Sequence, residues 1–296
     1  MTERYSFNLV DEPWIPCLRL DGEPADLSLR DVLAHAHELQ MVAAELPQTT
    51  AALMRLLLAI LHRVFGPPDE EAWAELWTAS RFDAAALDAY LETWHHRFDL
   101  FDPERPFYQT DDRRVQPKSS VSLKYGIGFL HDQHFDHDGE DSGFEMSPAD
   151  AARALVSVHV FGLGGLAGIP DDKHTDAPCA SGVLFFVHGD TLKETLLLNL
   201  PEYPQENFFR PVSGADAPAW EQEDPFADGR EEPYGLLDYL TWQSRRPLLY
   251  PQRDASGRIK VMQYKLAPGL RIGGNVEDPQ KTYRMSKQGG LVPLRF

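Results

Sequence analysis

The chain of 296 residues has little cysteine and no long uninterrupted apolar run. Its two cysteines, Cys17 and Cys179, are too far apart in sequence to form a zinc-binding motif. No run of about 18 apolar residues predicts a membrane-spanning helix, and the first residues lack the basic and apolar parts of a secretory signal. These absences favour the reducing cytoplasm, with both cysteines acting as small apolar side chains.

The sequence also lacks the local motifs of several enzyme classes. No glycine-rich loop is followed by the lysine and hydroxyl residue of a P-loop, and none has the spacing of a dinucleotide-binding fingerprint. There is no Gly-x-Ser-x-Gly elbow, and no nucleophile–histidine arrangement can be assigned from local spacing. An enzyme is therefore not predicted, apart from one histidine-rich loop considered below.

Positive charge is scarce and unevenly distributed along the chain. The net charge of −18 argues against a general nucleic-acid binder, because phosphate binding depends on lysine and arginine. Residues 241–296 nevertheless contain 11 Lys/Arg and 3 Asp/Glu, a net charge of +8, whereas residues 1–240 carry −26. The basic end of the chain is either a solvated face or a surface for an anionic partner.

Apolar periodicity predicts an α+β fold: one large mixed domain with several helices around small sheets and long loops. Residues 49–65 are apolar on nearly every side of a helix, so this helix is expected to be buried. Capping boxes at Ser147 and Thr191 begin helices over 147–160 and 191–200. The other predicted elements are helices at 27–40, 69–79, 83–98 and 234–243, two strands within 5–20, a buried strand at 183–188, and a hairpin over 246–266.

A glycine-rich loop follows the helix predicted at 147–160. It contains Gly162, Gly164, Gly165 and Gly168. Glycine has no Cβ and tolerates positive φ, so another molecule can approach the main chain closely at such positions. The sequence therefore predicts a contact surface lined by backbone, although the glycines alone do not identify what it contacts.

A second unusual segment, residues 130–146, has neither helical nor alternating periodicity and is expected to be a surface loop. Its histidines, His131, His134 and His137, alternate with aspartates, and this donor set suits zinc, manganese or iron. A metal there could activate water, which makes a metal-dependent hydrolase one hypothesis. The alternatives are adventitious metal binding and a polar loop without metal, since the segment offers no rigid scaffold for the ligands.

Six segments, in chain order, resemble the CasA family, the large subunit of the type I-E CRISPR surveillance complex, Cascade. They are SFNLVDEPWIPC at 6–17, ELPQTTAALMRLLLAILHRVF at 45–65, RPFYQ at 105–109, FGLGGLAG at 161–168, TLLLNL at 195–200 and LTWQSRR at 240–246. The resemblance covers nearly the whole chain. It implies that residues 1–296 form the family's N-terminal α/β domain and that the family's C-terminal four-helix bundle is missing. The family's glutamine wedge, which helps to separate the DNA strands, falls after residue 296 and is not assigned.

The resemblance implies a non-catalytic cytoplasmic subunit that needs neither a cofactor nor a metal. Its implied partners are the other Cascade subunits, the 5′ end of the crRNA, double-stranded target DNA and a nuclease–helicase, with no membrane contact. Family members sense the protospacer-adjacent motif in the DNA, help to open the duplex and recruit the nuclease–helicase. A purely structural scaffold that caps the guide and never reads DNA is the alternative.

The resemblance also assigns candidate site residues. The family's glycine loop, which lies against the minor groove, falls on Phe161, Gly162, Leu163, Gly164 and Gly165. Backbone without side chains suits a narrow groove with a degenerate code, because base pairing with the guide supplies the sequence specificity. The family's groove lysine matches Lys265, with Lys260 as the second candidate.

A flexible contact loop of the family falls on about residues 130–146. Its candidate residues are Phe129, Leu130, His131, His134, His137 and Phe144. The many carboxylates of this loop would repel phosphate, so contact with protein or guide RNA is an open alternative to contact with DNA.

Overall fold

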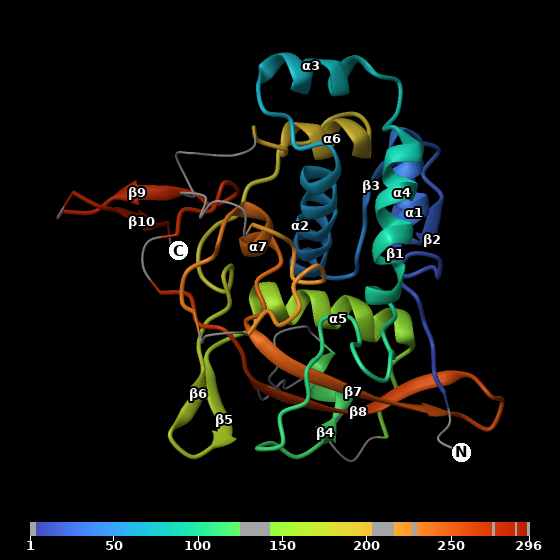
Figure 1. The fold of residues 1–296 in the computed structure, drawn as a ribbon, viewed down its shortest axis with the longest axis vertical. Helices are drawn as coiled ribbons and strands as arrows, with labels where there is room; N and C mark the ends of the chain where they lie inside the picture. The colour runs from blue at the N-terminus through green and yellow to red at the C-terminus, as the bar shows by residue number, and fades with distance from the viewer. Residues whose placement is uncertain are drawn as a thin grey trace.

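A long central helix organises the fold. The computed structural model describes residues 4–124, 143–202, 216–226, 230–273, 276–287 and 289–294. In Figure 1, α2 (Pro47–Val64) runs through the middle of the molecule and α5 (Pro148–Phe161) crosses beneath it. A long hairpin, β7 (Arg245–Arg253) with β8 (Ile259–Pro268), lies below α5.

Helix α2 is the centre of the hydrophobic core. Twelve of its 18 residues are buried, which confirms the burial predicted for residues 49–65. Three of the buried side chains are polar: Thr49, Arg55 and His62. Burial lowers the pKa of His62 from 6.5 to about 3, so its imidazole is neutral at physiological pH.

The remaining helices are short and surround this core. Thr191 and Glu194 form the predicted capping box at the start of α6, and Ser147 caps α5 by accepting the Asp150 N–H. The short helices are α1 (Leu29–Ala34), α3 (Glu70–Thr78), α4 (Ala84–Trp94), α6 (Leu192–Leu198) and α7 (Leu236–Leu240), with 3-10 turns η1 (Ala36–Glu38), η2 (His95–Arg97) and η3 (Ser120–Leu123).

The N-terminal sheet is antiparallel, with β1 (Ile15–Arg19) between β2 (Pro24–Leu27) and β3 (Leu39–Val42). The prediction of two strands within 5–20 is wrong for the first one, since Asn8 forms only an isolated bridge with Asp99. The reason is local. A turn in which the Glu12 N–H donates to the Asn8 carbonyl at 2.8 Å redirects the chain before a strand develops.

The C-terminal part contains the hairpin predicted over 246–266. β8 lies between β7 and β4 (Lys118–Ser119) in a three-stranded sheet. Two further hairpins project from the body in Figure 1, β5 (Gly165–Ile169) with β6 (Asp172–His174), and β9 (Tyr283–Met285) with β10 (Leu291–Pro293). Helices packed around several small antiparallel sheets confirm the predicted α+β class.

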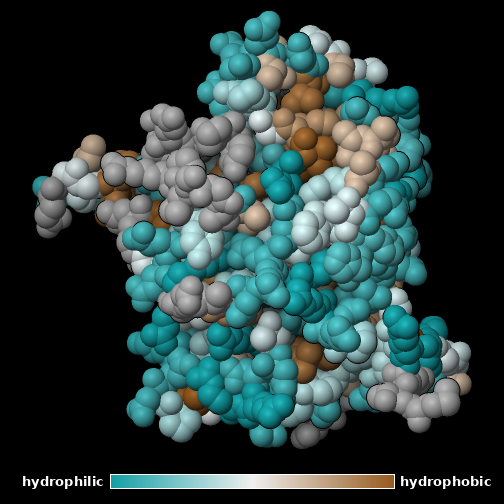
Figure 2. Space-filling model, viewed as in Figure 1, coloured by the Kyte–Doolittle hydropathy of each residue, from teal (hydrophilic) through white to brown (hydrophobic). Residues whose placement is uncertain are grey.

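The apolar run at 183–188 is not the buried strand that the sequence predicted. Within it, Leu184 makes only an isolated bridge with Lys281, while Phe185 and Val187 are 61% and 55% exposed. Alternate side chains of this extended segment face outward, and Leu184 and Phe186 pack on the core. Figure 2 shows apolar surface near the top of the molecule, whereas the lower face around β5–β6 is mostly hydrophilic. None of the helices in the described ranges has the length and hydropathy to span a membrane.

Candidate functional site

The glycine-rich loop joins the end of α5 to the β5–β6 hairpin, at the lower edge of the molecule in Figure 1. Phe161 is the last residue of α5 and is half-buried. Gly162 caps the helix by donating its N–H to the Val158 carbonyl at 3.0 Å. The predicted contact residues 161–165 therefore form one short connection between a buried helix and an exposed hairpin.

Gly162 is the buried end of this connection. A Cβ built on it would lie 2.5 Å from the Val158 carbonyl oxygen and 2.8 Å from Nη2 of Arg245. Neither distance is compatible with a side chain unless the surroundings shift. The structure thus gives Gly162 a packing role, since the Arg245 guanidinium occupies the space that its side chain would need.

Gly164 is the exposed part of the loop. Its N–H donates to Oδ1 of Asp176 at 2.8 Å. A Cβ on Gly164 would lie 3.0 Å from the same oxygen, 3.2 Å from the backbone nitrogen of Asp176 and 3.3 Å from the His174 carbonyl oxygen. A side chain there would need a slight shift of both the Asp176 side chain and the adjoining main chain. Leu166, two residues further on, is 88% exposed. Backbone is therefore accessible at Gly164, beside a carboxylate that holds its amide.

Arg245 supports the loop from below. Its Nη2 donates to the Leu163 carbonyl at 3.0 Å and its Nη1 to the Ser244 carbonyl at 2.8 Å. Burial lowers the pKa of Arg245 to about 10, and the nearby Asp176 opposes this shift. Arg245 is still protonated at neutral pH, so a positive charge lies beneath the backbone of the loop.

Ion pairs hold the turn end of the β5–β6 hairpin, where Asp172 pairs with Ile169. Arg114 bonds both Asp112, at 2.7 Å, and Asp172 on β6, at 3.0 Å. Arg271 reaches Asp172 from another segment, also at 2.7 Å. The hydrogen bonds from Arg114 hold the pKa of Asp112 at about 2. These pairs join β6 to two segments that are distant in sequence.

Both candidate groove lysines lie on β8 and both are paired. Lys265 contacts Asp111 at 2.6 Å, and this hydrogen bond raises the pKa of Lys265. Lys260 forms an ion pair with Glu145. Either lysine would have to exchange a carboxylate for a phosphate in order to bind DNA.

Most of the predicted contact loop lies outside the described residues, including Phe129, Leu130, His131, His134 and His137. The hypothesis of a metal site at 131–138 lies there as well. Within the described part of the chain, no group of three or more His, Cys, Asp or Glu side chains could hold a metal ion. Phe144 is described and half-buried, with Nζ of Lys124 5.3 Å from the centre of its ring.

Sequence reasoning missed the two residues that position the loop, Arg245 and Asp176. Arg245 meets the Leu163 carbonyl across 82 positions of sequence, a separation at which no local pattern indicates contact. The Arg245–Arg246 pair belonged to a segment used for the family resemblance. Nothing in that pair indicated that one arginine is buried beneath a glycine loop.

The fold and the loop together define a mixed α+β protein with an accessible main-chain surface at the end of a buried helix. The family model for CRISPR-associated protein Cse1 matches residues 8–296, and the chain belongs to this family. This confirms the resemblance inferred from the sequence.

Relatives of known sequence and structure agree with this assignment. The chain is 34% identical over 305 residues to CasA/Cse1 of Thermus thermophilus, a match that covers 98% of this chain and 57% of the relative. Cse1 from Acidimicrobium ferrooxidans has a similar structure, with a TM-score of 0.82, 31% identity, and coverage of 99% of this chain and 58% of that one.

A chain of a CRISPR RNA-guided surveillance complex, described as pre-nicking, also has a TM-score of 0.82, with 27% identity and coverage of 99% of this chain and 61% of that one. The chain thus spans less than two thirds of the length of each of these relatives.

Proposed function

We propose that this chain is the motif-sensing part of a non-catalytic subunit in a crRNA-guided DNA surveillance complex of the cytoplasm. In this role it associates with the other Cascade subunits and the 5′ end of the crRNA, and it senses the protospacer-adjacent motif in duplex DNA. It also helps to open the duplex and to recruit a nuclease–helicase. Its family membership and its likeness to a chain of a surveillance complex support this proposal.

The exposed backbone at Gly164 is the observation that carries motif sensing. The minor groove of B-DNA is about 6 Å wide and offers mainly a distinction between A·T and G·C pairs. A main chain without Cβ can enter such a groove further than one with side chains. Arg245, buried beneath the loop, adds positive charge without adding bulk at the surface.

The charge of the whole chain fits a subunit that acts within an assembly. With a net charge of −18, the protein is expected to bind DNA weakly by itself. Partner subunits and guide–target base pairing would supply most of the affinity, as in RNA-guided recognition generally. The glycine loop then needs to contribute only discrimination between motifs.

Substitution of Gly164 by aspartate in the assembled complex tests this function. Gly164→Asp places both a side chain and a negative charge at the proposed contact, so binding to motif-bearing duplex should weaken at least tenfold while assembly is retained. Gly290→Asp is the matched control, because it adds the same charge at an exposed position of the β9–β10 turn where a Cβ has ample space. Motif discrimination that survives Gly164→Asp would favour a scaffold that caps the guide without reading DNA.

A further inference from the structure

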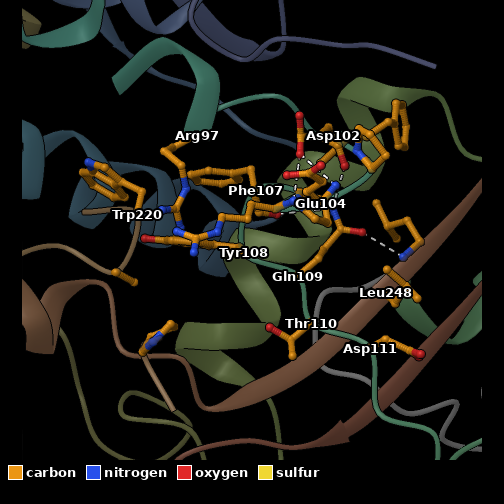
Figure 3. A pocket seen from close by; sticks show the side chains of 18 of the residues that line it. Arg97, Asp102, Glu104, Phe107, Tyr108, Gln109, Thr110, Asp111, Trp220 and Leu248 are labelled. Atoms are coloured by element: carbon orange, nitrogen blue, oxygen red, sulfur yellow. Dashed lines mark hydrogen bonds between the residues drawn. The ribbon is translucent and has the colours of Figure 1, made fainter. Parts of the chain in front are cut away.

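A cleft of about 520 Å³ lies away from the glycine loop, between the segment 97–111, the segment 219–225 and strand β7. Figure 3 shows it from close by, with Arg97 directed toward Trp220 and Tyr108. None of the glycine-loop residues 161–165 lines this cleft, and of the groups named for motif sensing only Asp111, the partner of Lys265, does. Its walls, its charges and its one strained residue together indicate a binding site.

Polar contacts fix both walls of the cleft. On one wall, Gln109 donates to the Leu100 carbonyl at 2.7 Å and accepts the Leu249 N–H at 2.8 Å. On the other wall, Trp220 donates its indole N–H to the hydroxyl oxygen of Tyr90 at 2.7 Å. The cleft is therefore formed in advance of any ligand.

Tyr108 has a φ of +57°, in the left-handed region that residues other than glycine rarely adopt. Such backbone strain persists only where the surrounding structure enforces it, and it is frequent at ligand sites. The His159 side chain bonds the Tyr108 carbonyl at 3.1 Å and helps to hold this conformation.

Arg97 brings an unsatisfied charge to the cleft. Its Nε is buried without a hydrogen-bond partner, and among the described residues its guanidinium forms no ion pair. Burial lowers the pKa of Arg97, and the like charge of Arg105 lowers it further, while Asp102 opposes the shift. Arg105 itself is exposed and has only a 3.7 Å contact with the solvated carboxylate of Glu223, an interaction of little energy. An oxyanion placed between the two guanidiniums would relieve their repulsion and satisfy their donors.

The rim of the cleft determines which oxyanion fits. Glu104, Glu223 and Asp224 are exposed around it, so a polyanion such as RNA would meet repulsion. The aromatic floor also offers no open face for stacking a base, because Phe107 and Trp220 are only 1% and 2% exposed. A single carboxylate flanked by positive charges matches both the two arginines and the acidic rim.

We propose that this cleft binds an extended segment of a partner protein, with one acidic side chain between Arg97 and Arg105 and basic side chains against the rim. The carboxylate accepts hydrogen bonds from the two guanidiniums. Lysine or arginine residues beside it pair with Glu104, Glu223 and Asp224. This site can be tested separately from the proposed DNA contact, since residues 161–165, Lys260 and Lys265 do not line the cleft.

Fluorescence anisotropy with two labelled pentapeptides tests the site. The probes are Lys-Ala-Glu-Ala-Lys and the same peptide with glutamine in place of glutamate, and the protein is the full chain. We expect the glutamate peptide to bind at least tenfold more tightly. Non-specific attraction to a protein of net charge −18 has the opposite sign, because the glutamine peptide is the more positive one.

Substitutions of an arginine inside the cleft, Arg97, and of one outside it, Arg81, provide the controls. Arg97→Gln should reduce the preference for glutamate to less than twofold, and Arg97→Lys should retain part of it. Arg81→Gln removes the same charge from an exposed position outside the cleft and should leave the preference for the glutamate peptide unchanged.

Equal or tighter binding of the glutamine peptide would overturn the proposal, as would a glutamate preference that persists in Arg97→Gln. Binding of a uridine oligonucleotide that Arg97→Gln abolishes would also overturn it, in favour of an RNA site.

Discussion

The core beneath α2 and the loop at the end of α5 each depend on a buried arginine, but in different surroundings. In the core, Arg55 contacts Asp278 at 2.9 Å with both side chains almost fully buried. At the loop, Arg245 holds the Leu163 carbonyl from below, whereas Gly164 is held from outside by the exposed Asp176. In the first arrangement the two charged groups are paired with each other within the protein, although Nε of Arg55 has no hydrogen-bond partner among the described residues. The second is fixed on its inner side and open to solvent on its outer side.

This difference indicates where stability and binding can be separated. The core network joins α2 to a segment more than 200 residues later, and Tyr239 and Gln280 complete it with hydrogen bonds to Asp278 and Arg55. Removing either Arg55 or Asp278 leaves the other charge buried without its counter-ion. At Gly164 the loop is held by one solvent-accessible hydrogen bond, from its N–H to Asp176, so changes there should affect a ligand more than the fold.

The largest effect is expected from breaking the core network. Asp278→Ala leaves the Arg55 guanidinium buried without its counter-ion and should lower the free energy of unfolding by about 3 to 5 kcal/mol, measured by urea denaturation. Asp88→Ala is the control, since it removes an exposed carboxylate that pairs with Arg30 at 2.6 Å and should cost less than about 1 kcal/mol. Equal losses in the two variants would mean that the buried pair is not the stabilising feature.

A second substitution separates the two halves of the glycine loop. Gly162→Ala forces a methyl group against the Val158 carbonyl and Arg245, so we expect a loss of about 1 to 3 kcal/mol in unfolding free energy. Gly164→Ala should cost about 1 kcal/mol or less, because its Cβ contacts with Asp176 and His174, at 3.0 to 3.3 Å, are longer than the 2.5 Å contact at Gly162 and need only a slight shift. Thermal unfolding of both variants measures the difference, and a reversed order would contradict the division into a packing glycine and a surface glycine.

Much of the core was predictable from the sequence because its causes are local. The continuous apolar character of residues 49–65 predicts a buried helix whatever packs on it, and the capping residues Ser147 and Thr191 begin helices through contacts within one turn. The partner of Arg55 was not predictable in this way, because Asp278 lies 223 positions away.

The loop shows the same limit more sharply. Gly162 and Gly164 are indistinguishable as sequence. The Val158 carbonyl and the Arg245 guanidinium make Gly162 a packing residue, whereas Gly164 is exposed. The failed strand at 183–188 has a similar cause. An apolar run predicts burial, but whether a neighbouring strand covers both faces depends on tertiary structure, and here Phe185 and Val187 face outward.

The pH dependence of stability provides a further test at the junction of the two regions. Burial lowers the pKa of His159 from 6.5 to about 3. Between these pH values the unfolded chain binds a proton that the folded chain does not, so stability falls as the pH falls. His159→Gln should reduce the loss of unfolding free energy between pH 6.5 and 5 by about 1.5 kcal/mol.

Urea denaturation of the unsubstituted protein and of His159→Gln at several pH values gives two curves of unfolding free energy against pH. His62 contributes its own loss in both proteins, since its pKa is lowered in the same way, and it therefore cancels in the difference. Above pH 7.5 the two curves should run parallel. Parallel curves throughout the range would mean that His159 takes up a proton in the folded state.

The smallest expected effect concerns Lys265, because it already has a partner. If Lys265 exchanges Asp111 for a DNA phosphate, Lys265→Ala should lower the affinity of the assembled complex modestly and reduce the slope of log affinity against log salt by at most about one. Asp111→Ala is the informative counterpart, since it releases the lysine and should raise the affinity. If neither variant changes the salt dependence, the ion pair is structural, and Lys260→Ala becomes the next lysine to measure by the same titration.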